Sequence, residues 1–426
     1  MNRYESYKDS GLEWIGEIPS HWDLPLGSRI GTYSKGNGIK KDEVVETGLP
    51  CIRYGQIYTI YDHSVSEVSS FIDLETSKTS VSVHKGTLLI TGSGETKEDI
   101  GKCIVYVGES PVWVGGDIII LHPDNSYNPF YLTYLINCES VRIQKEVHSK
   151  GEIVVHIYSK NFSQMRFVLP PLPEQEQIVS FLDEKTSKID DLIKKKEQKI
   201  ELLKEYRTSL INRVITKGLN PDVPMKDSGV EWIGEIPSHW EVSKMKTGVS
   251  LITEKGTPSS DDVKISPENV ESNTGRCLSL YSDYEGEGLI FQSGDILLNK
   301  LRLYLKKIVL TTSDGFSMGE MIVLRSKRKT DYRYLYYSLF HQGLIDLLDS
   351  QSNGVKLPRV SPETIMNTDL MFPPLTEQEQ IVSYLDQRTG EIDSTIDSEK
   401  KKIDLLKEYR QSLISSVITG KIKVVD

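Results

Sequence analysis

The chain has few of the features that mark secreted, membrane or metal-binding proteins. Its four cysteines (Cys51, Cys103, Cys138, Cys277) lie far apart, which excludes a C-x-x-C motif and argues against a disulfide framework. No apolar run approaches the ~18 residues that a membrane helix requires. The opening residues, MNRYESYKDSG, lack the apolar stretch of a signal peptide. We therefore expect a cytoplasmic protein.

The sequence also lacks a basic surplus. It has 51 Lys and Arg against 61 Asp and Glu among 426 residues, a formal net charge of -10. That balance runs against the basic footprint of most nucleic-acid-binding proteins. Residues 23–169 carry 14 basic and 17 acidic side chains (net -3), however, and residues 241–372 carry 16 and 17 (net -1). Counterion release depends on the phosphates contacted and not on net charge, so the acidic balance does not exclude DNA binding. We expect the chain alone to bind DNA weakly.

A long internal repeat organises the sequence. Residues 13–22 read EWIGEIPSHW and recur at 231–240, an offset of 218. Residues 174–219 recur at 377–422 with an offset of 203, and 27 of the 46 positions are identical. The stretches between these frame segments differ in length and sequence. Similar frames with dissimilar inserts indicate one common partner and two different targets.

We divide the chain into four segments on this basis. Residues 1–173 and 220–374 are each predicted to form a globular domain with its opening segment, and residues 174–219 and 375–426 a long helix each. The inserts contain short β-type runs such as TLLIT (87–91) and MIVLR (321–325), followed by helices predicted at Pro129–Asn137 and Tyr332–Leu339. These patterns predict an α+β protein with two mixed α/β domains.

The apolar residues of the two helical segments repeat with the heptad period of a coiled coil. The predicted seam residues are Leu182, Ile189, Ile193, Lys196, Ile200, Leu203, Leu210, Leu385, Ile392, Ile396, Glu399, Ile403, Leu406 and Leu413. Lys196 and Glu399 are the charged members, and antiparallel overlap brings them to the same level. We predict that they pair, although each could instead extend to water.

Both helix starts carry sequence signals. Thr376 and Glu379 form a predicted capping box, and Pro173 occupies the equivalent place in the first copy. In the opening segments, Trp14, Ile15, Trp22 and their copies are predicted docking anchors for the insert domains. We expect His21 and His239 to be satisfied within packed turns, the alternative being a functional role.

Polar and basic loops carry the functional hint. Arg and Lys contact phosphates and guanine, and Asn contacts adenine. The candidate DNA-binding residues of the first insert are Lys35, Asn37, Lys40, Lys41, Ser93, Thr96, Lys97, His148 and Lys150. Those of the second are Asn299, Lys300, Arg302, Tyr304, Lys306, Lys307, Asn353, Lys356 and Arg359. The matched placement of the last loop in each copy, around Gly151 and Gly354, strengthens this interpretation.

Signs of self-contained chemistry are absent from the sequence, which has no P-loop, HExxH or GxSxG motif. Asn128-Pro129-Phe130-Tyr131 partly matches an amino-methyltransferase motif but lacks its second proline, and we expect it to begin a helix. We predict no catalytic residue, no metal site and no cofactor bound by this chain. A stand-alone enzyme and a coiled-coil scaffold without DNA function stay as alternatives.

The duplicated PPLPEQEQIVSFLD and PPLTEQEQIVSYLD segments, each domain opened by WIGEIPSHW, resemble the DNA specificity subunit of type I restriction–modification systems. The resemblance spans nearly the whole chain, and GDILLNKLRLYLKK (294–307) is also similar to the family's recognition-domain pattern. The first insert departs from it there, with GTLLITGSGETKEDIGK (86–102), so base-reading residues cannot be copied between the halves.

The resemblance implies two target recognition domains that each read half of a bipartite DNA site, joined by an antiparallel coiled coil with pseudo-twofold symmetry. It also implies two methylation subunits and motor–nuclease restriction subunits as partners. Adenine methylation and DNA cleavage would belong to those partners, with S-adenosylmethionine, ATP and magnesium bound there. A specificity subunit of a fused system outside type I is the closest alternative.

Overall fold

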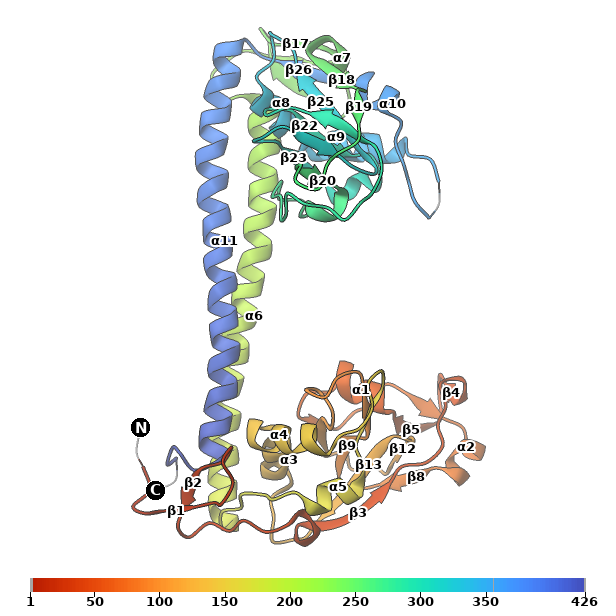
Figure 1. Cartoon of the computed structure of the whole chain (residues 1–426), viewed down its shortest axis with the longest axis vertical. Coiled ribbons are helices and arrows are strands. Elements are labelled where there is room, and N and C mark those ends of the chain that lie inside the picture. The colour runs from red at the N-terminus through yellow and green to blue at the C-terminus, as the bar shows by residue number, and fades with distance from the viewer. Residues whose placement is uncertain (1–2, 355, 425–426) are drawn as a thin grey trace. The chain divides into compact units, whose positions relative to one another are not determined.

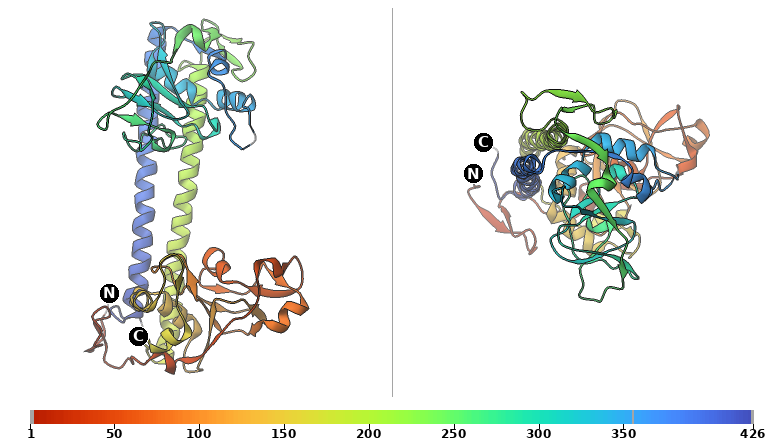
Figure 2. Two further views of the ribbon diagram at one scale, coloured as in Figure 1. Left: turned by 45° about the vertical axis from the view of Figure 1, so that its right-hand side comes forward. Right: turned by 90° about the horizontal axis from the view of Figure 1, so that it is seen from above.

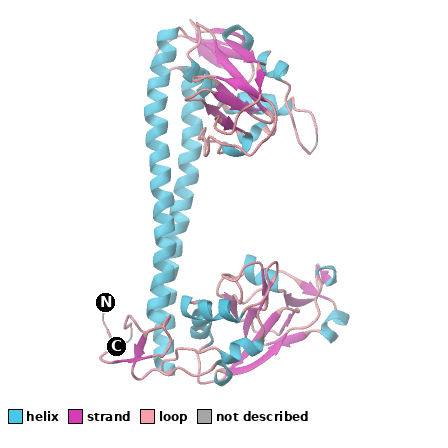
Figure 3. Ribbon diagram, in the orientation of Figure 1, coloured by secondary structure: helices cyan, strands magenta, loops and turns pink. Residues whose placement is uncertain are grey.

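A computed structural model of the chain describes residues 3–354 and 356–424. The chain forms two compact units. Unit 1 comprises Met1–Lys195 with Lys402–Asp426, and unit 2 comprises Lys196–Lys401. Each unit therefore holds one insert, one opening segment and a portion of both long helices. Figure 3 shows that each insert combines helices with strands, as the sequence predicts.

The long helices are α6 (Leu172–Lys217) and α11 (Leu375–Ile418). They lie side by side, as two views show (Figures 1 and 2). Each begins directly after a proline, Pro171 or Pro374. The start of α6 lies two residues before the predicted one, and α11 starts at the predicted residue 375. Thr376 therefore lies inside the first turn of α11, and the predicted role of Thr376 as the N-cap of a capping box is wrong.

In unit 1 the insert contains two five-stranded sheets with the orders β3-β13-β9-β11-β6 and β4-β7-β5-β12-β8. The strands of these sheets are β3 (Gly31–Lys35), β4 (Val44–Val45), β5 (Leu49–Ile52), β6 (Ser64–Val65), β7 (Phe71–Ile72), β8 (Val81–Val83), β9 (Leu88–Thr91), β11 (Cys103–Tyr106), β12 (Val112–Val114) and β13 (Ile118–Pro123). Leu88 and Ile90 belong to one buried cluster and Leu89 to another. The central strands are thus covered on both faces, which explains their unbroken apolar runs.

Helices cover one face of the first sheet. They are α3 (Pro129–Asn137), α4 (Glu139–His148) and α5 (Ser159–Gln164), with α1 (Tyr54–Thr59) and α2 (Leu74–Thr79) elsewhere in the insert. The predicted helix at Pro129–Asn137 is confirmed. The side chain of Asn128 accepts hydrogen bonds from the amides of Phe130 and Tyr131, so this residue caps α3, as its sequence context predicts.

Unit 2 repeats this plan with smaller sheets, β18-β25-β22-β23 and β19-β21-β24-β20. The strands of these sheets are β18 (Val249–Ile252), β19 (Lys255–Gly256), β20 (Lys264–Ile265), β21 (Gly288–Phe291), β22 (Ile296–Asn299), β23 (Ile308–Leu310), β24 (Gly315–Ser317) and β25 (Met321–Ser326). A separate antiparallel pair is formed by β17 (Glu241–Lys244) and β26 (Asp369–Phe372). Its helices are α7 (Met245–Gly248), α8 (Tyr332–Leu339), α9 (Gln342–Ser350) and α10 (Pro362–Met366). The offset of 203 between the halves holds from β13 and β25 onward, and the predicted helix at Tyr332–Leu339 is confirmed.

Each opening segment forms a two-stranded hairpin, β1 (Tyr7–Asp9) with β2 (Glu17–Pro19) and β15 (Met225–Asp227) with β16 (Glu235–Pro237). The tryptophan that follows is fully buried, Trp22 in unit 1 and Trp240 in unit 2. Each covers a left-handed glycine just beyond a long helix, Gly420 (φ +73) after α11 and Gly218 (φ +69) after α6. The opening segments therefore dock on the C-terminal ends of the long helices.

This docking corrects one prediction about the anchors. Ile15 and Trp22 are buried as predicted, but Trp14 is 40% exposed and does not act as an anchor in unit 1. The indole of its copy, Trp232, lies with its ring centre 5.1 Å from that of His341 in unit 2. Both opening segments therefore bury their second tryptophan, whereas the first tryptophan is placed differently in the two units.

Candidate nucleic-acid interface

The two basic loops of the second insert lie together. The amide of Arg302 donates to the carbonyl of Pro358 at 2.9 Å, and the amide of Val360 donates to the carbonyl of Lys300 at 3.1 Å. Leu301 and Arg359 also form a β-bridge. The segments 299–306 and 352–360 are thereby joined into one surface of unit 2. Val355, within the predicted loop, lies outside the described residues.

Three predicted residues of this surface have structural roles. The Asn299 side chain is buried and bonds both the amide and the carbonyl of Leu301. Lys306 is 4% exposed and donates its ammonium to the Phe340 carbonyl, and burial lowers its pKa to about 8. The Lys307 ammonium donates to the Pro267 carbonyl at 2.6 Å. Their side chains hold the loops in place and are not presented to a ligand as predicted.

The remaining candidates of unit 2 face solvent. Arg302, Tyr304, Asn353, Lys356 and Arg359 are exposed, and Lys300 is partly exposed. Arg302 adopts a left-handed backbone (φ 52), which a non-glycine residue occupies at some cost in free energy. Its guanidinium has no hydrogen bond or ion pair with any described residue. The Arg302 guanidinium is therefore available to a ligand.

The carboxylate of Glu320 pairs with two of these cations. Glu320 forms ion pairs with Arg359 and, at 3.4 Å, with Lys300. Both interactions are partly exposed, so each is worth little to stability. A phosphate could exchange for this carboxylate at small cost.

The loops of the first insert are also brought together. β10 (Ser93–Gly94) pairs antiparallel with β14 (Val155–His156), and His156 forms a bridge with Lys150. The amide of Gly92 donates to the carbonyl of Asp117, whose carboxylate lies 4.0 Å from the Lys35 ammonium. Candidates from three separate parts of the sequence therefore belong to one region of unit 1.

Individual candidates in unit 1 differ in how available they are. The exposed ones are Lys35, Asn37, Lys40, Lys41, Thr96, Lys97 and Lys150. Ser93 is buried and its hydroxyl lies 2.9 Å from Nδ1 of His156, so a direct contact of Ser93 with DNA is not supported. Thr96 donates to Asp99, Asn37 donates to the Thr79 carbonyl, and His148 is half-buried at the end of α4.

A matched hairpin ends the candidate surface of each unit. Lys150 and His156 exchange backbone hydrogen bonds of 3.0 and 2.8 Å, and Asn353 and Arg359 exchange bonds of 2.9 and 3.0 Å. The two pairs are related by the offset of 203. Figure 1 shows the second hairpin, in light blue, projecting from unit 2. The matched Gly151 and Gly354 both have positive φ, of 114° and 101°, which explains their recurrence.

The sequence reasoning missed the apolar residues of these hairpins. Ile153 is 89% exposed, Val154 49% and Leu357 55%. Single exposed apolar side chains are ordinary on protein surfaces, but here one recurs at the matched position of each hairpin. The signal was present as an apolar residue at the matched positions 154 and 357.

The predicted ion pair within the coiled coil is confirmed in unit 2. The Lys196 ammonium lies 2.7 Å from Glu399, whose other carboxylate oxygen binds Lys199 at 3.0 Å. The Glu399 side chain is only 5% exposed. Most of the apolar seam residues are buried, and Ile193, Leu203 and Leu406 are partly buried. The helices therefore pack through the predicted seam.

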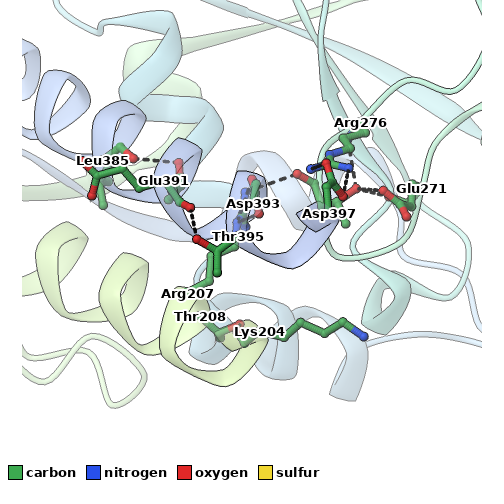
Figure 4. A network of polar contacts seen from close by, with 12 residues as sticks. Lys204, Arg207, Thr208, Glu271, Arg276, Leu385, Glu391, Asp393, Thr395 and Asp397 are labelled. Atoms are coloured by element: carbon green, nitrogen blue, oxygen red, sulfur yellow. Dashed lines mark hydrogen bonds and ion pairs between the residues drawn. The ribbon is translucent and has the colours of Figure 1, made fainter. Parts of the chain in front are cut away.

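A repeated arginine connects each helix pair to its insert. In unit 2, Arg207 of α6 lies 3.1 Å from Asp393 of α11 and donates to the Thr274 carbonyl of the insert. Figure 4 shows this contact beside the pair of Arg276 and Asp397. In unit 1 the copy, Arg410 of α11, lies 2.9 Å from Asp190 of α6 and 3.7 Å from Asp62 of the insert.

The repeated histidines contact the helix starts. His21 lies 3.0 Å from Glu174, which also accepts from the Trp22 indole, and His239 lies 2.8 Å from Glu377, which accepts from Trp240. These contacts support the prediction that both histidines are satisfied within a packed turn.

Within residues 3–354 and 356–424, no group of three or more His, Cys, Asp or Glu side chains could hold a metal ion. In the same residues, no helix is both long and apolar enough to cross a membrane.

Comparisons with known proteins agree with the duplicated plan. The MjaVIII type I restriction enzyme specificity subunit of Methanocaldococcus jannaschii is 23% identical, over 96% of this chain and 94% of that subunit. A chain solved in a study of the assembly and conformational transition of the type I R-M system superposes with a TM-score of 0.72 at 13% identity, over 95% and 99% of the two chains. The HsdS subunit from Thermoanaerobacter tengcongensis gives 0.54 at 14% identity, over 95% and 98%.

These solved structures share the fold with this chain. The family model for the type I restriction modification DNA specificity domain matches residues 30–202 and 237–408, once in each half. The chain belongs to the family of type I restriction–modification DNA specificity proteins.

Proposed function

We propose that this chain is a non-catalytic subunit that binds DNA sequence-specifically and reads a bipartite, asymmetric target. The observation that carries the proposal is the repetition of one topology with different loops. From β13 and β25 onward the two inserts keep one register, whereas the candidate loops share few side chains. A common frame with different reading loops suits two unlike half-sites.

The proposed partners are two methylation subunits and the restriction subunits that complete the enzyme. Support comes from an exposed Leu–Tyr pair that recurs on the long helices. Leu202 and Tyr206 are 65% and 49% exposed, and Leu405 and Tyr409 are 63% and 49% exposed. An identical apolar surface present twice fits one kind of protein partner bound twice.

We assign the chemistry to these partners. Adenine methylation and DNA cleavage would be theirs, with S-adenosylmethionine, ATP and magnesium bound there and not by this chain. We expect the complex to act in the cytoplasm. The net charge of -10 supports a division of labour in which the chain supplies specificity and the assembled complex supplies most of the affinity.

The test is methylome sequencing of a host that carries this gene with its partner genes. We expect methylated adenines in a two-part motif that disappears when this gene is deleted. Replacing residues 241–372 with the insert of a relative should change one half of the motif only. Methyl transfer by the purified chain alone, with labelled S-adenosylmethionine and DNA, would contradict the non-catalytic assignment.

The spacing of the half-sites provides a second test. We propose that the helix pair sets this spacing, so deletion of one heptad from residues 183–210, with a matching deletion in α11, should change the spacer and leave both half-sites as they were. Changed half-sites with an unchanged spacer would contradict this role of the helices.

A further inference from the structure

The hairpins 150–156 and 353–359 are closed by the same pair of backbone hydrogen bonds and carry different side chains. Lys150 pairs with His156 as Asn353 pairs with Arg359, in the same register. At the next matched positions Ile153 corresponds to Lys356, and Val154 to Leu357. The backbone pairing is therefore common to both units, whereas the side chain differs at the first of these tip positions and is apolar in both units at the second.

This difference indicates what the hairpins contact. A surface that binds one protein partner twice should keep its side chains, as Leu202 with Tyr206 and Leu405 with Tyr409 do. A surface that reads two different DNA half-sites should keep its geometry and vary its side chains. The hairpins follow the second pattern, and they are continuous with the basic surface around Arg302 in unit 2 and with the loop of Ser93 in unit 1.

The exposed residues at the matched positions 154 and 357 are apolar in both copies. Val154 is 49% exposed and Leu357 55% exposed. Phosphates and most base edges offer charged or hydrogen-bonding groups, which such side chains cannot recognise. The C5 methyl group of thymine in the major groove is the apolar group that distinguishes one base from the others.

We propose that the two hairpins are equivalent base-reading elements, one for each half of the target, and that Val154 and Leu357 contact thymine methyl groups. The proposal rests on the proposed function of the chain. On the second hairpin one cation, the exposed Lys356, lies next to Leu357 in the sequence. The hairpin can thus combine a phosphate contact with apolar base recognition.

The experiment uses the complex of the full chain with its methylation subunits and a duplex containing the mapped target. Each thymine is replaced singly by deoxyuridine, which removes only the C5 methyl group. In each half-site one replacement should weaken binding roughly three- to fivefold, the effect of one buried methyl group. Leu357→Ser should cause a similar loss and abolish the deoxyuridine effect in one half-site only, and Val154→Ser should do so in the other.

Salt dependence separates this apolar contact from ionic ones. Leu357→Ser should leave the slope of log affinity against log salt unchanged, whereas Lys356→Gln should reduce the slope by about one. Leu357→Met should retain the thymine preference. Leu278→Ser changes a leucine of unit 2 that is 66% exposed and serves as the matched control, with binding unchanged.

The outcomes that overturn the proposal are distinct. A complex that binds its target but responds to deoxyuridine at no thymine would show that the hairpins do not read methyl groups. A Leu357→Ser complex that loses its methylation subunits while its thymine response persists would make the hairpin a protein contact. A wild-type complex without a defined DNA target would instead refute the proposed function itself.

Discussion

The two units use the same frame arginine in different ways. In unit 2, Arg207 is 8% exposed, binds Asp393 and reaches a backbone carbonyl of the insert, with the pair of Arg276 and Asp397 beside it. In unit 1, Arg410 binds Asp190 at 2.9 Å, but its partner in the insert, Asp62, is 3.7 Å away and has a side chain that is 83% exposed. The contact between helices is repeated and the contact with the insert is not.

The repeat preserves the contact of each arginine with the neighbouring long helix and not its contact with the insert. The partner on the neighbouring long helix has the same residue type and equivalent position in both units. The partner on the insert differs in residue, chemistry and distance. A frame residue can therefore hold either insert, and the tightness of the attachment depends on what the insert offers.

The largest expected effect tests the part that the units share. Trp22→Ala in unit 1 and Trp240→Ala in unit 2 should each cost about 3–5 kcal/mol, because both rings are fully buried at a helix end. Trp14→Ala, which removes a ring that is 40% exposed, should cost less than about 1 kcal/mol. Hydrogen exchange by mass spectrometry would assign each loss to its unit. Equal losses for Trp14→Ala and Trp22→Ala would show that the two rings contribute equally to stability.

A buried lysine gives unit 1 a pH dependence that can be compared with unit 2. Lys145 is 4% exposed and donates to the Gly101 carbonyl, and burial lowers its pKa to about 8. Below pH 8 both folded and unfolded chains hold the proton, so the full cost of burying the ammonium is present. Above pH 8 the folded lysine loses its proton first, and the cost falls as the pH approaches 10.5.

Lys145→Met should therefore be most favourable relative to wild type near pH 7. Its advantage should shrink by roughly 2 kcal/mol between pH 7 and pH 9.5, measured as the difference in unfolding free energy from urea titrations. Lys306→Met in unit 2 serves as the comparison, because burial also lowers the pKa of Lys306 to about 8. A difference that is constant with pH would show that the buried amine does not titrate in this range.

A third change tests the charged pair of the seam. Lys196→Glu or Glu399→Lys alone should cost about 1–2 kcal/mol, because each leaves like charges facing in a mostly buried position. The double swap should recover most of this loss, but not all, since Lys199 lies 3.0 Å from the Glu399 carboxylate. Thermal melting of the four proteins forms a double-mutant cycle. Additive losses in the double variant would mean that the pair is not coupled.

The smallest expected loss of stability comes from changing the two frame arginines themselves. Arg207→Gln should destabilise unit 2 by about 1–2 kcal/mol, whereas Arg410→Gln should cost unit 1 less than about 1 kcal/mol, because Arg410 and its insert partner are more exposed. Hydrogen exchange in the segment around Thr274 and in the segment around Asp62 would report the two attachments. Equal changes would remove the asymmetry between the units.

Much of the fold follows from the sequence because the repeat and the apolar periods are strong signals. The limits of α3 and α8, the strand runs and the pairing of Lys196 with Glu399 were all predictable. The N-cap of α11 was not, because the pattern around Thr376 satisfies a capping rule although the helix already begins at Leu375, directly after Pro374. The sheet orders were also out of reach, since β9 and β13 pair across residues that no local pattern connects.

The candidate interface was predictable as a set of loops and not as a set of side chains. Sequence reasoning selected Lys306 and Ser93 for their chemistry, but burial removes both from the surface. It missed Val154 and Leu357, because one matched apolar residue in a polar loop is a weak signal until the backbone places it at a hairpin tip. The distinction between a held and a presented side chain is a tertiary property.

The Lys196–Glu399 contact also bears on how the helices find their alignment. If either helix slipped by one heptad, Lys196 would face Ile392 or Leu406, and Glu399 would face Ile189 or Leu203. Each slipped alignment would leave two charges against apolar side chains without a partner, at a cost of several kcal/mol. Together with Arg207–Asp393 in unit 2 and Arg410–Asp190 in unit 1, the Lys196–Glu399 pair therefore favours one register of the two helices over its neighbours.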